Sequence, residues 1–141
     1  AFLREFYFPH VRRALEPVVE AGIRTVWHAD GYINPIVDDI LACGASGLQG
    51  FQEEYGVDVA EIARRRTVSG ERLTLFAGLS SASVLPHGSI DDVRQGIERI
   101  IDALWNECAL FILPGNNILP DCPVGNIVAM YRHAASYQPA H

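Results

Sequence analysis

Hydrophobic positions along the chain change repeatedly between the spacing of a helix and that of a strand. From about residue 2 to residue 21 they recur on one helical face, which predicts a helix or two short helices interrupted at Pro9 or Pro17. Gly22 follows and ends this segment. Compact apolar runs then predict strands at 24–28, 47–51, 72–77 and 109–113.

Helix start signals follow each of these runs. The helix after the second run is expected to continue to Arg66. The clearest helix begins after the third run, where a serine and an aspartate have the spacing of a capping box. The expected starts are, in order, Asn34 before Pro35, Asp58, Ser89 with Asp92, and Pro123.

The resulting order is a helix followed by four strand–helix pairs, which predicts an α/β fold with parallel strands and outer helices. The run at 24–28 is expected to be a short buried strand. The run at 109–113 has no polar alternation, so both of its faces are expected to be buried, as in a barrel or a doubly wound sheet. Four units cannot close a barrel and would leave two edge strands and an apolar inner face uncovered.

Composition narrows the classes of partner and compartment. The formal net charge is −6 and all 11 basic residues are arginine, so the chain lacks the clustered cations of a nucleic-acid surface. The run at 64–66 is interpreted as the exposed end of a helix. No stretch approaches the length of a membrane span. Cys43, Cys108 and Cys122 match neither a disulfide nor a zinc spacing, which favours a reducing cytoplasm.

Polar side chains stand at or just past the ends of the four predicted strands. Because the carboxyl ends of parallel strands meet at one edge of a sheet, we expect them to line one pocket. The histidine could act as an acid–base group or a ligand, or could be satisfied by local hydrogen bonds, and the aspartate and asparagine could instead only shape turns. These residues are His28 and Asp30 as catalytic candidates, and Asn116, Gln49 and Ser80 as substrate-binding candidates.

Five segments carry a resemblance to a known family, and they occur in the family's order. They are HADG at 28–31, GASGLQGFQEEYGVD at 44–58, VLPHGSIDDV at 84–93, ILPGNNI at 112–118 and PVGNIVAM at 123–130. Together they resemble the second half of the uroporphyrinogen decarboxylase (URO-D) superfamily, and the resemblance covers nearly the whole chain. It implies that residues 1–141 are the C-terminal half of a (β/α)₈ TIM barrel with its site at the C-terminal mouth.

The resemblance is closer to the cobalamin-linked methyltransferases of this superfamily. Those enzymes hold zinc through a His-x-Cys pair and a later Cys, and the zinc activates a thiol. His28 matches the first ligand, whereas Asp30 and Asn116 stand where the two cysteines would be. We therefore expect no tightly held zinc and no cofactor in this chain, with zinc or a corrinoid partner confined to the intact protein; if any residues bind a metal, they are His28 and Asp30.

Three functions remain open at this stage. The first is a methyltransferase-like enzyme of corrinoid metabolism, and the second is a uroporphyrinogen decarboxylase of porphyrin (haem) biosynthesis, whose substrate-binding His also falls at Asn116. The third is a non-catalytic half-barrel that only binds a partner or ligand, a possibility raised by Ser80, which replaces a frequent family Asp. The expected partners are a small-molecule substrate and either the missing N-terminal half or a second copy of the chain. This half alone is expected to be inactive.

Overall fold

Four strands lie side by side in sequence order and all run in the same direction. The computed structural model describes residues 1–139, so the last two residues of the expected 1–141 domain lie outside it. Each strand falls within its predicted run, and the predicted parallel pairing is confirmed. The strands are β1 (Val26–His28), β2 (Gly47–Gln49), β3 (Thr74–Ala77) and β4 (Ala109–Ile112).

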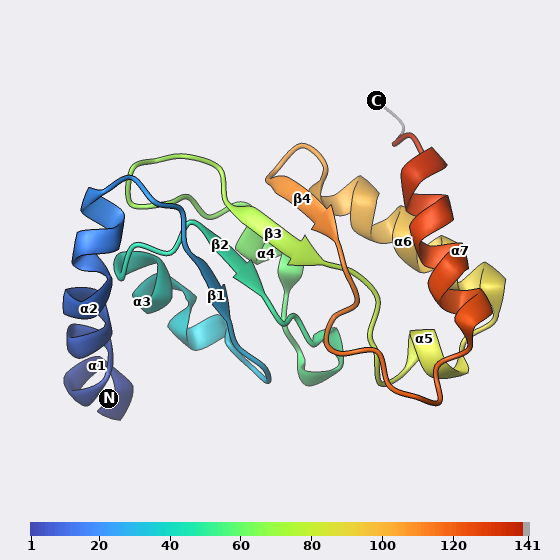
Figure 1. Cartoon of the computed structure of the whole chain (residues 1–141), viewed down its shortest axis with the longest axis horizontal. Coiled ribbons are helices and arrows are strands. Elements are labelled where there is room, and N and C mark those ends of the chain that lie inside the picture. Colours follow the sequence, from blue (N-terminus) through green and yellow to red (C-terminus); the bar gives the residue numbers. More distant parts are fainter. Residues whose placement is uncertain (140–141) are drawn as a thin grey trace.

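The helices cover one face of this sheet. In Figure 1, α4 lies behind the strands, α2 and α3 lie on the side of β1, and α6 and α7 lie on the side of β4. This alternation confirms the α/β class and the outer position of the helices. The helical elements are α1 (Phe2–Phe6), α2 (Phe8–Glu20), η1 (Asn34–Ile36), α3 (Val37–Ala42), η2 (Glu53–Tyr55), α4 (Val59–Ala63), α5 (Val84–His87), α6 (Ile90–Leu104) and α7 (Val124–Ser136).

Two of the predicted capping signals work as expected. The Asp58 carboxylate accepts a hydrogen bond from the Glu61 amide at 2.8 Å and starts α4. Ser89 and Asp92 form a complete capping box at the start of α6. Each satisfies amides that the first helical turn leaves unpaired. Pro123 directly precedes α7, as predicted.

Other local predictions were wrong in detail. Asn34 does not cap α3 but lies within the 3-10 helix η1, and its buried Oδ1 atom has no hydrogen-bond partner among residues 1–139. Helix α4 ends at Ala63 rather than at Arg66. The N-terminal break falls at Tyr7, because Pro9 lies in the first turn of α2, where a missing amide costs no hydrogen bond. The short helix α5 was not predicted.

The strand register sorts the side chains into two rows with different environments. The outer row packs against the helices, and its two central members, Leu48 and Leu75, are fully buried. The inner row lies on the opposite face and includes two of the candidate site residues. The outer row is Trp27, Leu48, Leu75 and Leu110, and the inner row is His28, Gln49, Phe76 and Phe111.

The prediction that the first and last strands are buried was wrong. In β1 the Val26 side chain is 48% exposed, and in β4 Phe111 is 54% exposed. The reason is topological: both side chains belong to the inner face, where a closed barrel would place the side chains of the opposite strands. An apolar run in the sequence therefore indicates burial in a complete barrel, which the described residues do not form by themselves.

No helix within residues 1–139 is both long enough and apolar enough to cross a membrane.

The capping box of α6 generates a stability prediction. Ser89→Ala should lower the free energy of unfolding by about 1 kcal/mol, because the Asp92 amide loses its acceptor. Ser83→Ala is the matched control, since Ser83 precedes α5 without a capping hydrogen bond from its side chain. Urea unfolding by circular dichroism measures both variants, and equal losses would contradict the assignment.

The same box predicts a pH dependence. Hydrogen bonds from Ser89 hold the pKa of the Asp92 carboxyl below its ordinary value of 3.8. The contribution is therefore fully present above that value and is lost as the pH falls through the lowered pKa. The stability difference between wild type and Ser89→Ala should narrow in acid. A difference that stays constant down to the acid transition would show that the Asp92 charge plays no part.

Candidate functional site

A hollow opens at the C-terminal ends of β1, β2 and β4. Its volume is about 460 Å³, within the usual size range of small-molecule sites. Parallel strands in register bring together residues that are far apart in sequence, and three of the predicted site residues meet here. The lining residues are His28, Gln49, Leu113, Pro114, Asn116, Asn117 and Ile118.

Asp30 links the two sides of this hollow, which is called the mouth from here on. Its Oδ1 atom accepts a hydrogen bond from Asn116 Nδ2 at 3.0 Å and lies 3.6 Å from His28 Nε2. Asn116 is oriented by its neighbour, because the Asn117 amide donates to Asn116 Oδ1 at 2.7 Å. The His28 and Asp30 side chains are each half exposed. The structure thus places a histidine, a carboxylate and an amide together, facing solvent.

Glycines and a glutamine position the segment that carries His28 and Asp30. Gly50 has φ +97°, and a Cβ atom there would lie 2.6 Å from the Ala29 carbonyl oxygen and 3.1 Å from the His28 ring. Gly31 turns the chain away with φ +78°, and its amide donates to Gln52 Oε1 at 2.7 Å. The two segments that follow β1 and β2 therefore pack so closely that only glycine fits at position 50.

Ser80 makes its hydrogen bonds within the turn after β3 and to the segment after β2, and its substrate-binding role stays a prediction. Its hydroxyl donates to Glu54 Oε1 at 3.0 Å and accepts from the amides of Ala82 and Ser83, both at 3.1 Å. Ser80 is not among the described residues that line the hollow. It shapes the turn after β3 and ties that turn to the segment after β2, so it supports the rim of the mouth.

Two aromatic residues of the inner face were missed in the sequence. Phe76 and Phe111 continue the row of His28 and Gln49 across β3 and β4. Their rings are stacked, with centroids 4.9 Å apart and planes 17° from parallel. The last inner row of the sheet is therefore polar on one side and aromatic on the other. Period-two alternation within the strands could have revealed this row, but four-residue strands are too short to separate it from an apolar run.

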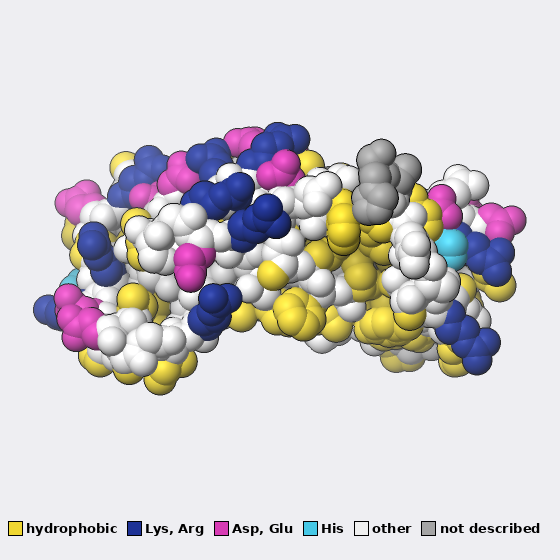
Figure 2. Space-filling view, turned by 90° about the horizontal axis from the view of Figure 1, so that it is seen from above, with side chains coloured by type: hydrophobic (Ala, Val, Ile, Leu, Met, Phe, Trp, Pro, Cys, Tyr) yellow, Lys and Arg dark blue, Asp and Glu magenta, His cyan; other side chains and the backbone are white. Residues whose placement is uncertain are grey.

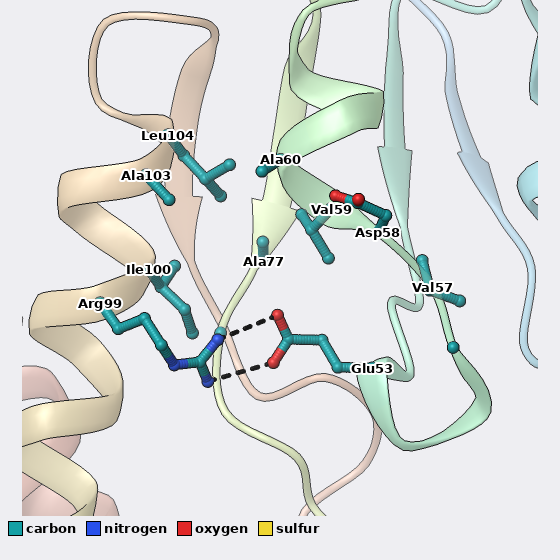
Figure 3. A pocket seen from close by; sticks show the side chains of 12 residues that line it. Glu53, Val57, Asp58, Val59, Ala60, Ala77, Arg99, Ile100, Ala103 and Leu104 are labelled. Atoms are coloured by element: carbon teal, nitrogen blue, oxygen red, sulfur yellow. Dashed lines mark hydrogen bonds and ion pairs between the residues drawn. The ribbon is translucent and has the colours of Figure 1, made fainter.

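An ion pair on the helical side holds part of the same rim. Figure 3 shows Arg99 of α6 reaching across a hollow to Glu53 of η2, the turn that follows β2. The two hydrogen bonds measure 3.3 and 3.2 Å. Apolar side chains of α4 and α6, including Val59 and Ile100, line the rest of this hollow. Because both charges are exposed, the pair contributes orientation more than stability.

The donor set at the mouth does not fit a thiolate zinc site. The three cysteines are buried elsewhere, and burial raises the pKa of the Cys108 thiol to about 11, so it stays protonated at neutral pH. In the described part of the chain, no three His, Cys, Asp or Glu side chains group closely enough to hold a metal ion. The Asn116 amide, moreover, already donates to Asp30. Activation of a thiol by zinc therefore does not fit the residues at these strand ends.

This arrangement suits proton exchange and the binding of a polar group. Asp30 stands 3.6 Å from the Nε2 atom of His28, so a carboxylate and an imidazole face the same hollow. Gln49 and Asn116, which line the same hollow, offer amide groups for orientation. The roles of these residues remain predictions.

The close approach at Gly50 can be tested directly. Gly50→Ala should displace the His28 segment, because the new methyl group meets the Ala29 carbonyl. Gly70→Ala is the matched control, since Gly70 also has positive φ but has open space around it. Both variants should lose roughly 1–2 kcal/mol from the left-handed backbone. Only Gly50→Ala should move the ring resonances of His28 in an NMR spectrum, and unchanged resonances would count against the packing described.

Comparison with known proteins agrees with this fold. A methylcobamide:CoM methyltransferase MtaA from Methanosarcina barkeri is 33% identical to this chain over 110 residues, which cover 75% of the chain. The MtaA of Methanosarcina barkeri strain Fusaro is 31% identical over 116 residues, which cover 78% of the chain. A methyltransferase structure from Methanosarcina mazei superimposes with a TM-score of 0.71 at 26% identity over 94% of the chain.

The chain spans about a third of the length of these relatives: 29% and 30% of the two sequences and 36% of the solved chain. All three are methyltransferases, so the comparisons favour the methyltransferase branch over the haem-pathway decarboxylases. The family model for uroporphyrinogen decarboxylase matches residues 1–137, so the chain belongs to the uroporphyrinogen decarboxylase (URO-D) family.

Proposed function

We propose that this chain forms the substrate-holding mouth of a methyltransferase-like enzyme, in which a methyl group passes between a corrinoid and a thiol. The observation that carries the proposal is the convergence of His28, Asp30 and Asn116 at the C-terminal ends of the strands. Active sites of (β/α)₈ barrels lie at this end. The MtaA relatives, named for transfer between a methylcobamide and CoM, support the reaction class.

The residues at the mouth would act on the thiol acceptor. A thiolate is the nucleophilic form of a thiol, so the acceptor must lose its proton as the S–CH₃ bond forms and the bond to the methyl donor breaks. His28 would take that proton, and Asp30 would stabilise the resulting imidazolium from 3.6 Å. Asn116 and Gln49 would orient a polar group of the substrate. The corrinoid would come from the intact protein or its partner.

The described half-barrel should be inactive by itself. Phe111 and the rest of the inner row face solvent, so water is not excluded from the mouth. Activity is expected only when the remaining strands close the barrel. The same activity assays distinguish the methyltransferase from the decarboxylase and from a non-catalytic chain.

In a closed barrel that contains this chain, His28→Ala should lower turnover at least about tenfold, the low end of the contribution of a positioned acid–base group. His87→Ala is the control, because His87 is exposed at the end of α5, away from the mouth. The assay follows the absorbance of methylcobalamin in the presence of a small thiol. Unchanged turnover in His28→Ala would show that the pocket has no catalytic role. Release of carbon dioxide from uroporphyrinogen would favour the decarboxylase.

A metal analysis tests the ligand assignment. The chain should bind no stoichiometric zinc at neutral pH, because Asp30 and Asn116 replace the soft ligands that a thiol-activating zinc requires. Asn116→Cys together with Asp30→Cys should create zinc binding at the mouth, which gives a positive control. Stoichiometric zinc in the unaltered chain that disappears in His28→Ala would contradict the assignment.

A further inference from the structure

The hollow between α4 and α6 is enclosed by this chain alone. Its volume is about 390 Å³, and it lies on the helical side of β3, a strand that is paired on both edges. Its lining comes from η2 and the segment after it, α4, the end of β3, and α6. Because none of these elements is an edge strand, closure of a barrel at β1 and β4 would leave the hollow unchanged.

Short side chains leave this space open. Figure 3 shows Ala60 of α4, Ala77 of β3 and Ala103 of α6 around it. Of its larger apolar neighbours, Val59 is 7% and Leu104 is 2% exposed, so the walls belong to the core. Protein interiors contain few voids larger than a water molecule. A hollow of this size with apolar walls therefore has the dimensions and the lining of a small-molecule site.

The polar edge of the hollow carries more negative than positive charge. Glu53 and Asp58 contribute two carboxylates, against the single guanidinium of Arg99, which already donates to Glu53. Asp58 Oδ1 accepts the amide of Glu61, whereas its Oδ2 atom has no hydrogen-bond partner among residues 1–139. The whole chain has a net charge of −6. The local and the overall charge both favour a cation.

An anionic ligand fits this edge less well. To pair with Arg99 it would have to displace Glu53, and it would then face the carboxylates of both Glu53 and Asp58. Like charges at such a distance repel and raise the cost of binding. An ammonium group, in contrast, could donate to Asp58 Oδ2 and leave the ion pair intact, while its apolar part fills the space between the three alanines.

From this geometry we propose that the hollow between α4 and α6 binds a small amine, with a compact apolar body and one ammonium group. The ammonium lies beside Asp58, and the apolar body lies among Ala60, Ala77 and Ala103. A bound ligand contacts η2 and α6 together and so braces the loop that follows β2. This site is separate from the mouth and goes beyond the proposed methyl transfer.

The test is an NMR titration of the full chain with three probes: cyclohexylamine, cyclohexanol and cyclohexanecarboxylate. They share one ring and differ in charge. Cyclohexylamine should bind saturably and should shift the methyl resonances of Val59, Ile100 and Leu104, which line the hollow. The carboxylate should bind at least about fivefold more weakly, because it lacks an attractive partner for its charge. Cyclohexanol should lie between the two.

The titration must also locate the probe, because other apolar surface is available. In Figure 2, hydrophobic side chains gather over the middle and right of the molecule, where β4, α6 and α7 lie in Figure 1. A second hollow there is lined by Ile112 and Ala134, among others, and an apolar ring could adhere to it. Shifts confined to Ile112 and Ala134, with Val59 and Leu104 unmoved, would overturn the proposal.

Two variants test the space and the charge separately. Ala103→Leu should weaken cyclohexylamine binding at least about tenfold, because the added methyl groups occupy the space of the ring. Ala14→Leu, at an exposed alanine of α2, is its matched control. Asp58→Asn keeps a capping oxygen for α4 and removes the charge, so binding should weaken about fivefold. Asp121→Asn removes the same charge from an exposed loop position and should change nothing.

Three further results would overturn the proposal. Equal or tighter binding of cyclohexanecarboxylate would refute the ligand class. Cyclohexylamine binding that ignores both Ala103→Leu and Asp58→Asn would refute the location. Shifts that grow without saturating would show that the hollow is no site. Because these readouts measure binding only, none of them depends on the proposed methyl transfer.

Discussion

The parallel register of four short strands is the constraint on which the rest of this structure depends. The row His28, Gln49, Phe76 and Phe111 exists because the four strands pair residue by residue in the same direction. That register carries the segments after β1 and β4 to the same edge, where Asn116 reaches Asp30 across 86 residues of sequence. A shift of one residue in the pairing of either edge strand, β1 or β4, would exchange its inner-face and outer-face side chains. The residues of the mouth would then no longer lie together.

Close packing of backbone segments turns this edge into a site. Gly50 allows the segment after β2 to touch the Ala29 carbonyl and the His28 ring, and Gln52 holds the next turn through the Gly31 amide. On the far side, the Ser80–Glu54 hydrogen bond and the Arg99–Glu53 ion pair tie the β2 segment to its neighbours. Both sides of the rim are therefore anchored to the loop that follows β2, so a change in that loop is expected to reach the whole mouth.

The inner face serves two purposes that cannot be separated. It forms the floor of the candidate site, and it is also the surface that a complete barrel buries. The stacked rings of Phe76 and Phe111 illustrate this, because they adjoin the polar part of the row and yet leave Phe111 more than half exposed. Closing the barrel would bury these rings and exclude water from His28 in one step. Under the proposed function, assembly and chemistry would be coupled through this single row of side chains.

The sequence by itself determined the architecture and the approximate place of the site. Strand-length apolar runs, a serine–aspartate capping box and polar residues at strand ends act over a few residues, so local patterns were enough to locate four strands, the start of α6 and the convergence of His28, Gln49 and Asn116. The tertiary structure alone decided the rest. The Ser80 hydroxyl donates to Glu54, and Asn34 does not cap α3. Inner-face side chains of β1 and β4 are exposed. Each of these outcomes depends on which distant segment lies opposite a side chain, and a local pattern carries no information about a partner that is remote in the chain or absent from it.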